Sequence, residues 1–241
     1  MKECRIVVGV IDSGWDRAIQ EPRILPGASF VSARGLELAR HDDYGDVLGH
    51  GTSCCDLVLQ GAPDASVVPI KVFSQTLQTS PEIIVAALRW ALYRGVHVVS
   101  LSLATTRRFA ASSLYQVCRI AKRERVHIVA ARPEGQREPF FPACFPSVVS
   151  VEAWRGDREQ HIAKGSYADV CASPVQCART VGGARRELIG LSYAVPIVAA
   201  KIAVLTLNQG WLPKRDLLHA IGAGDNDRSN SRESFARTIP Q

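Results

Sequence analysis

Three short segments carry side chains whose combination could perform nucleophilic catalysis. Asp12 directly follows an apolar run, His50 lies in Gly-His-Gly-Thr-Ser, and Ser192 lies in Gly-Leu-Ser-Tyr-Ala-Val-Pro. A serine hydroxyl becomes a strong nucleophile when a histidine accepts its proton and a carboxylate orients that histidine. Taken singly, each residue also has a structural explanation, because a serine at the start of a helix is commonly only its N-cap. Together they favour acyl transfer at Ser192.

Short β-branched runs alternate with helical patterns along the chain, and these elements must position the three residues. Strands are expected at 5–11, 67–72, 96–102, 126–131 and 147–151. Helices are expected at 81–94, at 112–124, from about His50 onward, and through the apolar run that ends at Leu207. This alternation predicts an α/β three-layer sandwich with a mostly parallel central sheet. Ligands bind such sheets at the carboxyl ends of the strands, where Asp12 is placed.

Composition excludes several classes of protein. The chain has 241 residues, of which 46% are hydrophobic and 22% charged, so it is not a disordered, collagenous or coiled-coil protein. Residues 1–221 are expected to form one catalytic domain, and the polar residues 222–241 a C-terminal surface segment with some mobility. The 29 Lys and Arg against 23 Asp and Glu leave a charge of +6. These basic residues form small scattered clusters without a nucleic-acid motif, so no nucleic-acid partner is expected.

Cysteine usage and the N-terminus favour a cytoplasmic location. The seven cysteines cannot all pair, which argues against a secreted disulfide scaffold. The first apolar run is too short for a signal peptide, and polar residues interrupt 188–207, the segment closest to a membrane span. No membrane partner is therefore expected. Cys54 and Cys55 are interpreted as small apolar packing residues, and a cysteine-dependent function is the alternative.

The motifs and their order resemble the subtilisin-like serine protease family, the subtilases of peptidase family S8. The family has Asp-Ser/Thr-Gly, His-Gly-Thr and Gly-Thr-Ser-Met-Ala-Ala-Pro, which match residues 12–14, 50–52 and 190–196. Further likeness at 61–65, 98–103 and 141–148 extends the resemblance over about residues 5 to 221. It implies a subtilisin-like fold, a catalytic triad of Asp12, His50 and Ser192, and cleavage of a peptide or protein through an acyl-enzyme. It requires no metal and no organic cofactor.

One departure from the family concerns the oxyanion. Subtilases usually carry Ala-Ala-Gly-Asn-Glu-Gly where residues 130–135 here are Ala-Ala-Arg-Pro-Glu-Gly. Pro133 occupies the position of the asparagine that donates to the oxyanion, and proline has neither a side-chain donor nor an N–H. Removing such a donor costs about 10²–10³ in kcat. Arg132 is the candidate substitute donor, with Gln136 and Arg137 as further possibilities. A simply exposed Arg132 is the alternative.

A second departure concerns the substrate-binding segments. Ser-Leu-Ala-Thr at 102–105 replaces the Ser-Leu-Gly-Gly of the family. The residues that the resemblance assigns to substrate binding are Ser102, Leu103, Ala104, Thr105, Ala131 and Arg132. The added side chains predict a narrowed pocket, and hence a serine endopeptidase of restricted specificity, such as a maturation protease for a precursor peptide. The alternative is a non-proteolytic subtilase relative that binds peptides or acts as a scaffold. The intact triad favours the enzyme, whereas Pro133 and the crowded pocket favour the binder.

Overall fold

The computed structural model describes residues 6–33, 37–133, 138–154 and 162–223. Within these ranges the main sheet has nine strands in the order β3-β2-β4-β1-β5-β6-β7-β9-β8. The strands are β1 Val7–Asp12, β2 Ala28–Ala33, β3 Glu37–His41, β4 Ser66–Lys71, β5 Val98–Leu101, β6 His127–Ala131, β7 Val148–Ala153, β8 Ala163–Lys164 and β9 Val170–Ala172. The expected strands all lie in this sheet.

The strands are parallel except at the two edges. β2, β4, β1, β5, β6, β7 and β9 run in one direction, whereas β3 pairs antiparallel with β2 and β8 pairs antiparallel with β9. β1 lies between β4 and β5, so the chain builds the sheet outward from β1 in both directions. A crevice forms at the carboxyl ends of the strands where the order reverses in this way. Asp12 ends β1 at this position.

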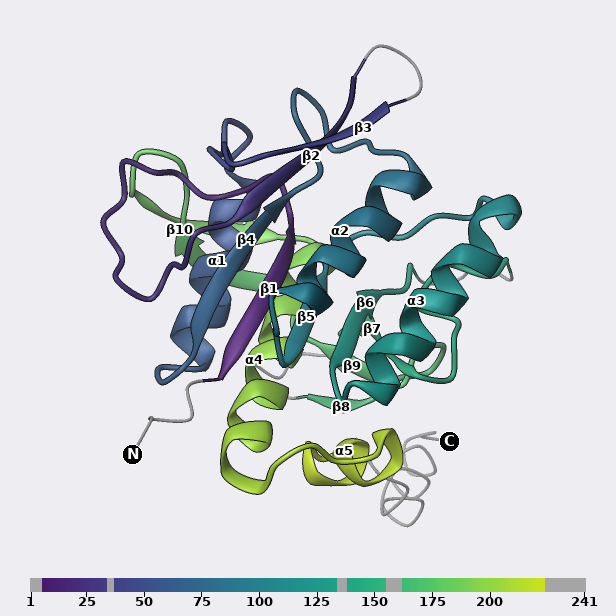
Figure 1. The fold of residues 1–241 in the computed structure, drawn as a ribbon. Helices are drawn as coiled ribbons and strands as arrows, with labels where there is room; N and C mark the ends of the chain where they lie inside the picture. The colour runs from purple at the N-terminus through teal and green to yellow at the C-terminus, as the bar shows by residue number, and fades with distance from the viewer. Residues whose placement is uncertain (1–5, 34–36, 134–137, 155–161, 224–241) are drawn as a thin grey trace, which may run out of the picture.

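Helices cover both faces of the sheet, which confirms the predicted three layers. α1 His50–Gly61 and α4 Leu191–Gln209 share one hydrophobic core with the sheet. α2 Pro81–Tyr93 and α3 Ala111–Arg123 share the other core, on the opposite face. Figure 1 shows α2 and α3 side by side in front of the sheet, with α1 and α4 behind it. The alternation of side chains along each strand divides the strand residues between the two cores.

Local signals in the chain account for the helix boundaries. Ser80 is the N-cap of α2 and Pro81 its first residue, as expected from the preferences for serine and proline at these positions. Gly95 follows the C-cap of α2 with a φ of 68°, a conformation that glycine adopts without strain. In α3 the buried residues repeat at helical spacing and form the stripe that faces the sheet. They are Leu114, Val117, Cys118 and Ala121.

α4 is the most apolar helix that the structure describes. Its 19 residues have a mean hydropathy of 1.6 and could by length and composition cross a membrane, but half of that stretch is buried within the protein. α4 packs against α1 and against β5, β6 and β7, as a core helix does. α5 Lys214–Ala220 follows, and Ala223 is buried in the same core. The described part of the domain therefore reaches residue 223, and the rest of the expected C-terminal segment lies outside the described residues.

The sequence patterns did not predict the antiparallel parts of the fold. These are the edge pairs β2–β3 and β8–β9, and a separate hairpin of β10 Val175–Arg179 and β11 Arg185–Ile189. Gly182 and Gly183, both at positive φ, lie in the turn of the hairpin, so a hairpin signal was present in the chain. Most residues of β10 and β11 are exposed, so these strands lack the apolar runs by which the buried strands were recognised.

Candidate active site

The carboxyl end of β1 and the first turn of α1 approach each other closely, and two glycines make this possible. A Cβ on Gly51 would lie 2.5 Å from the carbonyl oxygen of Gly14. A Cβ on Gly14, whose φ is +109°, would lie 2.1 Å from the carbonyl oxygen of Tyr44. Real Cβ atoms do not approach other atoms so closely, so both positions require glycine. This contact brings His50, the first residue of α1, next to Asp12.

A buried carboxylate fixes the start of α1. The Oδ2 atom of Asp46 accepts hydrogen bonds from the amide and the hydroxyl of Thr52, at 2.8 and 2.7 Å. Its Oδ1 atom accepts from the amides of Leu48 and Gly49. Burial alone would raise the pKa of Asp46, but the hydrogen bonds from Thr52 and its neighbours lower it overall, so the charged form is favoured. A negative charge here also suits the positive end of the helix dipole.

Asp12 and His50 form the central pair of the site. The Oδ1 atom of Asp12 lies 2.7 Å from Nδ1 of His50 and also accepts a hydrogen bond of 2.7 Å from the amide of Ser13. The side chain of Asp12 is 1% exposed and that of His50 is 12% exposed. A carboxylate on Nδ1 holds the imidazole in the tautomer that leaves Nε2 available as a base. This is the geometry that the catalytic assignment of these residues requires.

Ser192 is the second residue of α4, and Gly190, not Ser192, is the N-cap. The interpretation of Ser192 as a helix cap is therefore wrong. Pro196 lies inside the helix and has no N–H, so it leaves the carbonyl of Ser192 without its helical donor. The hydroxyl of Ser102 donates to that carbonyl instead, at 2.8 Å. Ser102 directly follows β5, so this bond fastens the end of β5 to the turn that carries Ser192.

Tyr193, the residue after Ser192, contacts His50 and so places the two segments in the same region. The ring of Tyr193 is 5.1 Å from that of His50 between centroids, with an angle of 38° between the planes. No hydrogen bond joins the hydroxyl of Ser192 to His50 among the described residues. Catalytic hydrogen bonds are often long before a substrate binds, so this geometry is compatible with a base and nucleophile pair.

Cys54 lies beneath the histidine, one turn along α1. Its Sγ atom is 3.9 Å from Nδ1 of His50 and 3.7 Å from the hydroxyl oxygen of Ser102. Potential ligand atoms of Asp12, His50 and Cys54 lie within 4.8 Å of one another. Burial raises the pKa of Cys54 to about 12, so its thiol is protonated near neutral pH. A protonated thiol is a poor metal ligand and a poor nucleophile, which favours the packing role over a cysteine-dependent function.

The charge of His50 responds to the same neighbours. Burial disfavours the imidazolium, yet the pKa of His50 lies above its ordinary value of 6.5, because the hydrogen-bonded carboxylate of Asp12 stabilises the charged ring. A histidine that must accept a proton from serine is active only when it is neutral. His50 can therefore act as a base only at a higher pH than an ordinary histidine.

The predicted substrate-binding residues come together at the carboxyl ends of β5 and β6. Residues 102–105 follow β5, and Arg132 and Pro133 follow β6, which pairs with β5. Thr105 exchanges two backbone hydrogen bonds with Phe141, at 2.9 and 2.8 Å, so residues 141–145 form a third side of this region. The roles of Leu103, Ala104, Thr105, Ala131 and Arg132 in binding, and that of Arg132 as an oxyanion donor, stay predictions.

Comparison with known proteins agrees with this geometry. Residues 4–223 match the profile of the subtilase family, Peptidase_S8. The chain belongs to the subtilase family. Among curated subtilases, it is 28% identical to a thermostable alkaline protease of Halalkalibacterium halodurans over 82% of this chain and 56% of the relative. It is 29% identical to subtilisin E of Bacillus subtilis over 86% of this chain and 57% of the relative. The chain thus spans little more than half the length of these two relatives.

Other subtilases match over more of their own length. Subtilisin DY of Bacillus licheniformis is 27% identical over 93% of this chain and 87% of the relative. The crystal structure of a cold-adapted subtilisin-like serine proteinase superposes with a TM-score of 0.72 and 21% identity, over 89% of this chain and 80% of that one. This likeness confirms the predicted subtilisin-like fold.

The motifs of this subtilase found Asp12, His50 and Ser192, but they missed the residues that hold them. Cys54 and Tyr193 contact the histidine, and Asp46 anchors the start of its helix. Asp46 lies three residues before the N-cap Gly49, so the usual helix-capping signal did not mark it. The contact of Tyr193 with His50 joins residues 143 positions apart in the chain, and no local pattern indicates it.

Proposed function

We propose that this subtilase is a serine endopeptidase of restricted specificity that cleaves a peptide or protein, such as a precursor that requires maturation. The observation that carries the proposal is the hydrogen bond of 2.7 Å between Asp12 and His50 at the start of α1, where the ring of His50 contacts Tyr193, the residue after Ser192. Membership of the family supports the reaction type. The side chains at 104, 105 and 132, which are absent from the common family pattern, support the restriction.

In the proposed mechanism, the Oγ atom of Ser192 attacks the peptide carbonyl while Nε2 of His50 accepts its proton. The imidazolium, stabilised by Asp12, then gives the proton to the leaving amine as the C–N bond breaks. Water attacks the resulting acyl-enzyme, His50 again accepts the proton, and the ester bond to Ser192 is broken. The amide of Ser192 is one of the first amides of α4 and has no carbonyl partner within the helix. It is a donor for the developing oxyanion.

A specific observation supports the alternative, a peptide-binding subtilase without proteolysis. Pro133, which follows β6 at the edge of the same region, offers neither an N–H nor a side-chain donor to the oxyanion. Acyl transfer would then depend on the amide of Ser192 and on any donor that Arg132 supplies. Such a site could hold a peptide without cleaving it.

Labelling with a fluorophosphonate probe separates the two functions. The probe phosphonylates a serine only when its hydroxyl is activated, and it requires no knowledge of the natural substrate. We expect labelling of the native chain and no labelling of Ser192→Ala. Ser112→Ala, an exposed serine on α3, is the matched control and should label like the native chain. A folded native chain that remains unlabelled would favour the peptide-binding function.

A further inference from the structure

An arginine lies beside the proposed catalytic centre with no described carboxylate to pair with it. The amide of Arg132 donates to the carbonyl of Val151 at 2.8 Å, which holds its backbone at the end of β6. Its side chain is only partly exposed, and its Nε atom is buried without a hydrogen-bond partner. No ion pair of Arg132 is present among the described residues. A buried Nε–H without a partner is costly, because an arginine N–H removed from water has lost its solvent hydrogen bond.

The charge of Arg132 acts on a neighbouring segment. Burial raises the pKa of the Cys144 thiol, and the positive charge of Arg132 opposes that increase. Cys144 belongs to the segment that pairs with Thr105 through Phe141. Arg132 thus follows β6 directly beside the segment after β5, which in turn pairs with Phe141. Ser102 ties the first of these segments to the carbonyl of Ser192, so this region adjoins the nucleophile.

Arg107 also lies close to this region in the sequence. It differs from Arg132 because a described carboxylate lies near it. Its amide donates to the hydroxyl of Thr105, so it lies at the same edge of the sheet. A hydrogen bond from Ser80 and, to a smaller extent, the charge of Arg107 lower the pKa of Glu82. Glu82 therefore offers Arg107 a nearby negative charge. Of Arg107 and Arg132, only Arg132 lacks a nearby carboxylate among the residues described here.

We infer that Arg132 binds a carboxylate of the substrate, so that this subtilase prefers a peptide with an acidic residue close to the cleaved bond. This inference rests on the proposed peptidase function and names the class of its substrate. A guanidinium presents its N–H groups in a planar fork that matches a carboxylate, and the resulting bonds are stronger than those between neutral groups. An incoming Asp or Glu side chain would supply the partner that Nε lacks. The narrow approach past Ala104 and Thr105 would add selection by size.

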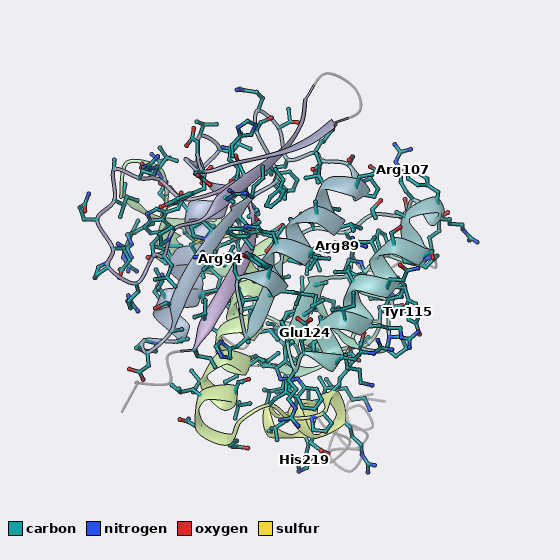
Figure 2. All side chains as sticks on the ribbon, viewed as in Figure 1. Arg89, Arg94, Arg107, Tyr115, Glu124 and His219 are labelled. Carbon is teal, nitrogen blue, oxygen red and sulfur yellow. The ribbon has the colours of Figure 1, made fainter. Side chains whose placement is uncertain are left out.

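Binding to an inactive variant tests the recognition without depending on catalysis. Peptides that differ only by Asp against Asn at one position, or Glu against Gln, are titrated calorimetrically into Ser192→Ala. We expect the acidic peptides to bind about 10–100-fold more tightly, the range that a charge-assisted hydrogen bond provides. Adding Arg132→Met, which retains length without charge, should remove the difference. Adding Arg89→Met, on the exposed surface of α2, should leave it unchanged; Figure 2 shows Arg89 on that helix.

Cleavage assays on the active chain separate this role from that of an oxyanion donor. An Arg132 that served the oxyanion would affect acidic and neutral substrates equally, so Arg132→Met would lower both rates and keep their ratio. If Arg132 binds the substrate carboxylate, Arg132→Met should lower the ratio of kcat/KM for Asp over Asn substrates toward one. Arg132→Glu should then favour substrates with Lys or Arg at that position. Equal binding of acidic and neutral peptides by Ser192→Ala would overturn the inference. If the native chain still labels with fluorophosphonate in that case, the proposed peptidase function stands.

Discussion

At the scale of single residues, Pro196 explains a bond that no motif describes. By removing one helical N–H from α4, it frees the carbonyl of Ser192, and the hydroxyl of Ser102 takes the vacant place at 2.8 Å. Ser102 was predicted to bind substrate, and the structure adds that its side chain contacts the backbone of the nucleophile. Ser102 is thus a positioning residue, since it holds Ser192 relative to the end of β5.

Removal of the Ser102 hydroxyl should therefore slow the chemistry more than it disturbs the fold. For Ser102→Ala we expect a labelling rate about tenfold lower, equivalent to the loss of one hydrogen bond. Ser100→Ala is the matched control, because its hydroxyl is buried on the same strand without a partner. Labelling rates and urea unfolding curves should be measured for both variants. Equal labelling rates for the two would contradict the positioning role.

Pro133 allows the oxyanion to be tested at one position. Pro133→Asn introduces a side-chain donor and should raise the labelling rate by up to about 10²-fold if the missing donor limits the reaction. Pro133→Leu introduces an N–H but no side-chain donor, and so separates the two effects of the substitution. An unchanged or lower rate for Pro133→Asn would show that another donor already serves the oxyanion.

The pH dependence follows from the surroundings of His50. Its pKa is raised above 6.5 in the folded chain, so the protonated form, which cannot act as a base, persists to higher pH. The rate of fluorophosphonate labelling should rise with pH and reach half its maximum on the alkaline side of pH 6.5. The labelling rate should be measured from acid to alkaline pH, with circular dichroism at each pH to confirm that the chain is folded. A midpoint below that value would mean that the carboxylate does not stabilise the ring as the geometry indicates.

At the scale of secondary structure, the sequence patterns predicted the buried parallel strands and the helices that cover them. Long apolar runs mark these strands, and Ser80 with Pro81 marks the start of α2. The hairpin of β10 and β11 was missed because its attachment depends on distant charges. The amide and the guanidinium of Arg179 both bond to Asp56 on α1, and the same guanidinium reaches Glu21 at 3.1 Å. Such pairings between distant segments have no local signature.

This charged contact should make a measurable contribution to stability. Asp56 is fully buried, and Arg179 has a side-chain exposure of 21%. Asp56→Asn would leave the largely buried guanidinium with the carboxylate of Glu21 as its remaining described partner, so the free energy of unfolding should fall by about 2–3 kcal/mol, below the range for fully buried pairs. Urea unfolding measures the change, with Glu187→Gln on the exposed face of β11 as the control. A loss no larger than that of the control would show that the hairpin is held by other contacts.

At the scale of the whole molecule, the two cores explain why sequence analysis located the three proposed catalytic residues but not the residues that contact them. Asp12, His50 and Ser192 each lie in a short motif that can be recognised locally. The parallel sheet brings the three motifs to one edge. Cys54 meets His50 within α1, but the contact of Tyr193 with His50 depends on how α1 and α4 pack together. Packing between helices from opposite halves of the chain is a tertiary property, so composition and periodicity could not reveal it.

The reactivity of the cysteines can report whether the whole domain unfolds as one unit. Cys54, Cys55, Cys118 and Cys171 are buried, whereas Cys177 on β10 is exposed. Burial also raises the pKa of Cys54 and of Cys118 to about 12, which suppresses the reactive thiolate. Alkylation followed by peptide mass spectrometry should therefore modify Cys177 rapidly in the native chain, and Cys177→Ser should remove that fast reaction. The four buried thiols should react only as urea unfolds the domain, with a common midpoint. If Cys54 reacted as fast as Cys177 without urea, the packing of α1 against α4 would have to open independently of the rest of the domain.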